Sequence, residues 1–136
     1  MQESIHELNE AISVNPSYLE ARTNLALVLS QNGDPNGAVK VYREILKQNP
    51  GRAEIHNNLG LVLMQMKDSK AEGAFKEALR LKPDYAEAHY NLALALLQTG
   101  KKEESNSEFE KAYQLAPHLK TTTKEKPNGS QTPPQN

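Results

Sequence analysis

The sequence predicts an all-α fold built from repeated pairs of antiparallel helices, and two observations carry this prediction. Prolines at positions 16, 50, 83 and 117 recur every 33 or 34 residues, and each follows a short phrase of similar composition. A fixed period of this length is typical of repeat architectures. Between successive prolines the apolar residues recur at intervals of three and four, as in Leu25, Val28 and Leu29. This spacing marks one face of a helix rather than a strand.

Each repeat is predicted to contain two helices, because one break interrupts the apolar spacing between successive prolines. In the first and third repeats the break contains Gly33 and Gly100, and glycine can take the left-handed conformation that ends a helix. The second break, at residues 66–69, has no glycine and is where one residue is missing, so we expect a tighter or irregular turn there. The last helix is expected over about Lys102–Leu115.

The start of each first helix carries a candidate capping box, in which two side chains satisfy free amides of the first helical turn. Each candidate places a glutamate three positions after the residue that would begin the cap. The pairs are Ser17 with Glu20, Asp84 with Glu87 and, in a weaker version, Gly51 with Glu54.

The two halves of each repeat carry different motifs. The first halves read Arg22-x-x-Leu25-Ala26-x-x-Leu29, His56-x-x-Leu59-Gly60-x-x-Leu63 and His89-x-x-Leu92-Ala93-x-x-Leu96. The second halves read Ala38-x-x-x-Tyr42 before Pro50, Ala71-x-x-x-Phe75-x-x-Ala78 before Pro83, and Ser105-x-x-x-Phe109-x-x-Ala112 before Pro117. This pattern resembles the tetratricopeptide repeat. A leading segment, Ser4-x-x-x-Leu8-x-x-Ala11 before Pro16, matches the second half alone, so the resemblance covers about residues 3–117.

The resemblance implies a right-handed α-solenoid, the superhelix that tetratricopeptide repeats form. Beyond residue 117 only Leu119 is a sizeable apolar residue, so residues 118–136 are predicted to be a disordered tail. The expected domain covers residues 1–117, with a half repeat at 1–16 and complete repeats at about 17–50, 51–83 and 84–117.

Two features depart from the family signature. Arginine or histidine stands in place of the first aromatic residue, and Ile45 and Ser105 stand where alanine is usual. Small residues at such places let paired helices approach closely, so we expect Ile45 to push its neighbours slightly apart.

The resemblance also implies that the first helices line a concave groove suited to an extended ligand. On each first helix, residues spaced by four, three and four fall on one narrow stripe. That stripe gives four rows of identical residue type, which we take as the candidate peptide-binding residues. The rows are Glu20, Glu54 and Glu87; Asn24, Asn58 and Asn91; Leu27, Leu61 and Leu94; and Gln31, Gln65 and Gln98.

Each row has a second interpretation that the sequence leaves open. Asparagine amides both donate and accept hydrogen bonds and can pair with a peptide backbone, but they could equally stabilise the helix pair and face water. The leucines suggest a partner because another helix face already supplies the core leucines, although partial burial is the alternative. The glutamates could attract basic ligand residues or cap their own helices. The expected core leucines are Leu25, Leu29, Leu59, Leu63, Leu92 and Leu96.

Several function classes are excluded or disfavoured by the same sequence. The formal net charge of -1 suggests neither a nucleic-acid nor an anionic-membrane partner. The chain has no cysteine, no phosphate loop and no zinc motif, and His56 and His89 lack a third ligand nearby in sequence, so we expect no metal, cofactor or catalysis. Family members that clamp a chaperone's C-terminal carboxylate use cations and asparagines at defined positions. Here those positions hold Thr23, Leu27, Asn58, Glu87 and Asn91, so such a clamp is not expected.

The prediction is therefore a soluble, non-catalytic protein-protein interaction module that binds a protein or peptide segment in its groove. A cytoplasmic location is slightly favoured, since no stretch reads as a membrane span or a signal peptide. The alternative is a structural scaffold, a self-assembling unit or a fragment of a larger repeat protein, associating through the ends of the solenoid.

Overall fold

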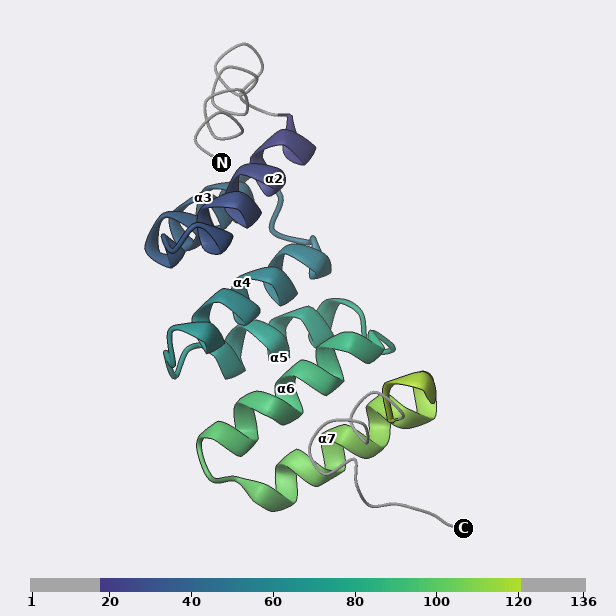
Figure 1. Cartoon of the computed structure of the whole chain (residues 1–136). Coiled ribbons are helices and arrows are strands. Elements are labelled where there is room, and N and C mark those ends of the chain that lie inside the picture. The colour runs from purple at the N-terminus through teal and green to yellow at the C-terminus, as the bar shows by residue number, and fades with distance from the viewer. Residues whose placement is uncertain (1–17, 121–136) are drawn as a thin grey trace. The chain divides into compact units, whose positions relative to one another are not determined.

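The structure, a computed structural model, describes residues 18–120, and this part of the chain contains helices and no strand. The predicted half repeat at 1–16 and residues 121–136 of the predicted tail lie outside the described residues. The described helices, drawn in Figure 1, are α2 (Leu19–Gln31), α3 (Pro35–Gln48), α4 (Ala53–Gln65), α5 (Ala71–Leu81), α6 (Ala86–Gln98) and α7 (Lys102–Leu115).

The chain divides after Pro83 into two compact units. In the N-terminal unit α2 packs on α3, α3 on α4 and α4 on α5, whereas the C-terminal unit pairs α6 with α7. Each pair of helices falls inside one predicted repeat, and α7 has the predicted bounds. The helix pairs and the all-α class are therefore confirmed. Helical structure also occurs at residues 118–120, past the predicted end of the domain at 117.

All three breaks between paired helices close in the same way. The residue after the helix cap has a positive φ, which is +85° at Gly33, +80° at Gly100 and 59° at Lys67. The next amide then bonds a carbonyl five residues back, the signature of a Schellman motif. The bonds run from Asp34 to Leu29 (2.8 Å), from Asp68 to Leu63 (2.8 Å) and from Lys101 to Leu96 (2.9 Å).

The prediction of an irregular second break is therefore wrong, because Lys67 takes the left-handed conformation that glycine takes elsewhere. The missing residue shortens the start of the next helix instead. Helix α5 has 11 residues, whereas α3 and α7 have 14 each. A turn leads into α5, in which the Asp68 carboxylate accepts the amide of Lys70 at 2.9 Å.

The predicted capping boxes are not formed at α4 and α6. The N-cap residues are Arg52 and Tyr85, one position later than a box would require, and neither side chain makes a cap hydrogen bond. Asp84 consequently lies outside the helix, and Glu87 lies too early in it to complete the box. For α2 the N-cap is likewise Tyr18, while Ser17 lies outside the described residues.

Small residues bring the paired helices together, as the family signature requires. Ala26 and Ala93 are fully buried, and Gly60 lies so close to the Phe75 ring that there is no room for a methyl group. Ile45 is also fully buried, and at the other departure the Ser105 hydroxyl donates to the Ala93 carbonyl at 2.8 Å. All the expected core leucines are buried except Leu29, which is half-buried. No helix within residues 18–120 is long and apolar enough to cross a membrane.

Candidate functional site

Helices α2 and α4, the two first helices of the N-terminal unit, approach each other near both of their ends. Near their C-terminal ends the Ser30 hydroxyl donates to Gln65 Oε1 at 3.1 Å. At their N-terminal ends both helices line one open cleft of about 440 Å³, whose lining includes Glu20, Asn24 and Glu54. The cleft thus brings Glu20, Asn24 and Glu54 of the predicted rows to one opening.

The asparagines of these two helices are available to a ligand. Asn24 is exposed and Asn58 is half-buried. Neither side chain hydrogen-bonds another residue within the part of the chain that the structure describes. Asn57, adjacent to Asn58, is instead 5% exposed and has an interaction partner. The side chains of residues 24 and 58 thus form no hydrogen bond between helices. This weakens the interpretation that the asparagines of this row serve only to stabilise the helix pair.

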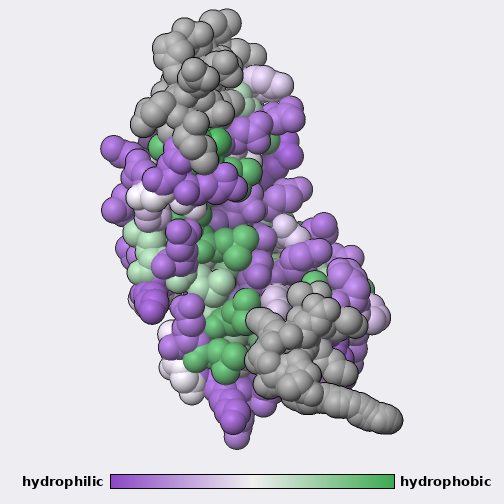
Figure 2. All heavy atoms as spheres, viewed as in Figure 1, coloured by the Kyte–Doolittle hydropathy of each residue, from purple (hydrophilic) through white to green (hydrophobic). Residues whose placement is uncertain are grey.

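The leucine row is an apolar stripe that the N-terminal unit leaves open to solvent. Leu27 is 41% exposed and Leu61 is 38% exposed, although large apolar side chains are usually buried. Figure 2 shows apolar side chains gathered on the visible face over α4, surrounded by polar ones. On α6 the equivalent Leu94 is half-buried. The same unit holds Asn91, which already interacts with another residue, so this repeat is less open than the first two.

The glutamate row lies in the first turn of each first helix. Glu20, Glu54 and Glu87 are all exposed, and each adds a negative charge near a helix N-terminus. Tyr18, 47% exposed, donates from its hydroxyl to Glu20 Oε1 at 3.3 Å. Glu54 and Glu87 complete no capping box, and all three carboxylates are accessible to a ligand.

One residue of the glutamine row makes a hydrogen bond within the protein. Gln31, Gln65 and Gln98 are exposed, but Gln65 is the acceptor of the Ser30 hydroxyl. This bond spans α2 and α4, so Gln65 helps to hold the candidate surface as well as to line it.

The structure gives a role to the positions where the family signature has an aromatic residue. The Arg22 guanidinium donates to Gln48 Oε1 at 2.7 Å, which ties α2 to the end of α3. The His56 ring bonds the Pro50 carbonyl at 3.0 Å, and His89 Nδ1 lies 2.7 Å from Glu108 Oε1 on α7. These side chains are therefore internal ties. Within residues 18–120, no group of three or more histidines and carboxylates could hold a metal ion.

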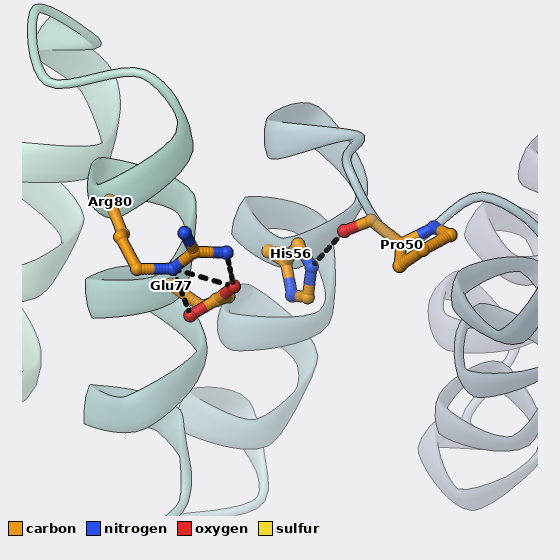
Figure 3. A network of polar contacts seen from close by, with 4 residues as sticks. All are labelled: Pro50, His56, Glu77 and Arg80. Atoms are coloured by element: carbon orange, nitrogen blue, oxygen red, sulfur yellow. Dashed lines mark hydrogen bonds and ion pairs between the residues drawn. The ribbon is translucent and has the colours of Figure 1, made fainter.

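A surface ion pair lies close to His56, as Figure 3 shows. Arg80 Nε donates to both carboxylate oxygens of Glu77 at 3.0 Å, one turn apart on α5. This hydrogen bond, more than any other influence, holds the pKa of Glu77 below its usual value. The pair is solvent-exposed, so it adds little to stability.

Sequence reasoning missed Tyr18 and Arg52, which line the cleft beside the predicted rows. Both precede a first helix at the same position of their repeats, as does Tyr85 in the third repeat. The recurrence of tyrosine in the first and third repeats is a signal that could have identified Tyr18, whereas Arg52 carries no such signal.

Profiles of known families match the chain in three places. Two are described as tetratricopeptide repeat, at residues 19–62 and 86–119, and one as TPR repeat, at residues 70–100. No curated protein sequence matches significantly.

Solved structures of MamA share the fold. One is 23% identical with a TM-score of 0.77 and aligns over 83% of this chain and 67% of that chain. A MamA RS-1 double mutant is 26% identical with a TM-score of 0.77, over 85% and 66% of the two chains. A MamA AMB-1 structure is 25% identical with a TM-score of 0.76, over 87% and 70%. The chain thus spans roughly two thirds of the length of these structures.

Proposed function

Because the chain belongs to the tetratricopeptide-repeat family, whose members bind proteins or peptides, we propose that it holds an extended segment of a partner protein. In the N-terminal unit the segment lies across the first helices α2 and α4, over Asn24 and Asn58. The module acts by binding and performs no chemistry of its own.

One observation carries this proposal: on α2 and α4, unbonded asparagines alternate with exposed leucines on a shared face. Leu27 and Leu61 lose unfavourable contact with water when a partner covers them. Asn24 and Asn58 can each donate to and accept from a peptide backbone, whatever its side chains. The leucines would therefore supply affinity, and the asparagines would set the direction and register of the bound segment.

The test uses the full chain as bait for partner proteins, which are then identified. Changing Asn24, Asn58 and Asn91 together to alanine is expected to reduce capture of a specific partner while helicity and melting temperature stay nearly unchanged. The matched control is Asn36→Ala, since Asn36 is exposed on α3, away from this face. Undiminished capture by the triple variant would remove the asparagines from the binding surface, and its unfolding would show that they are structural.

A second variant in the same capture experiment tests the leucine row. Changing Leu27, Leu61 and Leu94 to serine is expected to abolish recovery of the partner that the unchanged protein captures. Equal recovery would place binding outside the leucine row.

A second candidate function is self-association, and a different observation favours it. In the C-terminal unit Leu97 and Leu115 are each 46% exposed, outside the predicted rows. Sedimentation over a wide concentration range tests this candidate, because a second copy that covers these leucines would raise the mass with concentration. A constant monomeric mass would exclude it.

A further inference from the structure

We propose that the segment bound on the N-terminal unit carries basic and apolar side chains in alternation, the basic ones over the glutamate row and the apolar ones over the leucine row. This inference rests on the proposed function and specifies the chemistry of its ligand. It concerns α2 and α4, which are linked by the Ser30–Gln65 bond and by the cleft that both helices line.

The order of the rows along each helix produces the alternation. Four residues separate Glu20 from Asn24 and three separate Asn24 from Leu27, so at a rise of ~1.5 Å per residue the rows lie about 6 Å and about 4.5 Å to either side of the asparagines. Successive side chains of an extended segment point in opposite directions. A backbone paired with Asn24 and Asn58 therefore sends alternate side chains toward the glutamates and toward the leucines.

The distance from the bound backbone to each row matches the type of ligand side chain proposed for that row. The leucine row is the nearer one, and a branched or aromatic side chain can cover Leu27 and Leu61 from the backbone. The glutamate row is farther away and suits a long side chain with a terminal charge, such as arginine or lysine.

The cleft at the glutamate row combines two carboxylates with a tyrosine and one arginine. Its lining includes Glu20, Glu54 and the Tyr18 ring. Neither carboxylate forms an ion pair with a described residue, and each full charge exceeds the roughly half charge of the helix terminus beside it. An exposed tyrosine next to carboxylates can hold a guanidinium by stacking as well as by charge.

Arg52 lines the same cleft and makes no ion pair with a described carboxylate. Its guanidinium is a donor that carbonyl oxygens of the bound segment can accept. An acidic segment would instead bring its carboxylates toward Glu20 and Glu54, and like charges at close range are repulsive.

Short capped peptides test the alternation directly, with the full chain titrated against each in a fluorescence anisotropy assay. The first peptide alternates arginine and leucine, the second glutamate and leucine, and the third arginine and serine. The first is expected to bind at least about tenfold more tightly than either of the others, and its affinity should fall as salt rises. Equal binding of the first two peptides would overturn the inference.

Paired variants locate the preference. Glu20→Gln with Glu54→Gln should erase the discrimination between arginine and glutamate peptides and the salt dependence. The matched control is Glu103→Gln with Glu104→Gln, which removes two exposed carboxylates from the first turn of α7 and should leave the preference intact. Loss of the preference in the control alone, or in both variants equally, would overturn the assignment to the cleft.

The outcomes separate this inference from the function on which it rests. If both leucine peptides bind equally and Asn24→Ala with Asn58→Ala weakens both, the groove binds segments but the alternation is wrong. If no peptide binds while partner capture still depends on those asparagines, the alternation is again wrong and the proposed function stands. If no peptide binds and capture is insensitive to the asparagines, both proposals are overturned.

Discussion

Gly60→Ala tests whether the approach of α4 to α5 sets the packing of the second repeat. A Cβ atom at residue 60 would lie 2.5 Å from Phe75 Cε1, 2.7 Å from Cδ1 and 2.8 Å from Cζ. Ordinary carbon contacts are about 3.5–4.0 Å, so the ring or the helix must move by roughly 1 Å. The Phe75 ring is fully buried, so any movement of it must displace the side chains packed around it. The added methyl group therefore acts as overpacking in the core.

The expected magnitude follows from two opposing effects. Overpacking of a well-packed core costs about 1–3 kcal/mol, whereas alanine in place of glycine within a helix contributes about 0.5–1 kcal/mol. With three ring atoms in conflict, we expect Gly60→Ala to lower the free energy of unfolding by roughly 1–2 kcal/mol. At about 4 °C per kcal/mol for a domain of this size, the melting temperature should fall by several degrees.

The assay is urea and thermal unfolding followed by circular dichroism, with Gly73→Ala as the matched control. Gly73 also lies within a helix and is exposed, and a methyl group added there would meet nothing within 4 Å, so only the helix-propensity gain of about 0.5–1 kcal/mol should appear. The free energy of unfolding should therefore fall in Gly60→Ala and rise in Gly73→Ala, so that the two variants differ by about 2 kcal/mol. If Gly60→Ala is as stable as Gly73→Ala, the helix pair adjusts freely and the close approach is not a constraint.

Three further predictions concern single side chains. The Tyr42 hydroxyl is buried without a hydrogen-bond partner among the described residues, so Tyr42→Phe should keep or raise unfolding stability, by up to about 1 kcal/mol. Burial also raises the pKa of Tyr42 to about 12, so the unfolded chain loses this proton first, and wild-type stability should fall between pH 10 and 12 more steeply than that of the variant. A parallel pH dependence in both proteins would contradict this. Lys67→Gly should raise the melting temperature, because a left-handed lysine costs about 1–2 kcal/mol and glycine does not carry this penalty; a destabilised variant would show that the Lys67 side chain matters more than its φ. Glu108→Ala should lower stability by about 1–3 kcal/mol, since it removes the carboxylate that lies 2.7 Å from Nδ1 of the buried His89 ring, while the exposed Glu110→Ala should change little in the same denaturation assay.

Residues close in sequence determined the helices, and this part could be predicted from the sequence. The spacing of Leu25 and Leu29 marked a helix face, the period of the prolines marked the repeats, and α7 has its predicted bounds. Exposure of Leu27 and Leu61 also followed from pattern alone, because another face of each helix already supplied the core. These features depend on local periodicity and on which side chains avoid water, both of which one chain segment encodes.

Contacts between distant residues were decided only by the tertiary structure. The Ser30–Gln65 bond joins residues 35 positions apart, and the cleft brings Tyr18 to the same opening as Arg52 and Glu54. The left-handed Lys67 and the unformed capping boxes likewise depended on where packing ends each helix, to within one residue. Local propensities differ by about 1 kcal/mol or less per residue, so the packing of neighbouring helices decides among them. The sequence by itself therefore determined which faces the helices present, and packing between repeats decided which of those side chains meet.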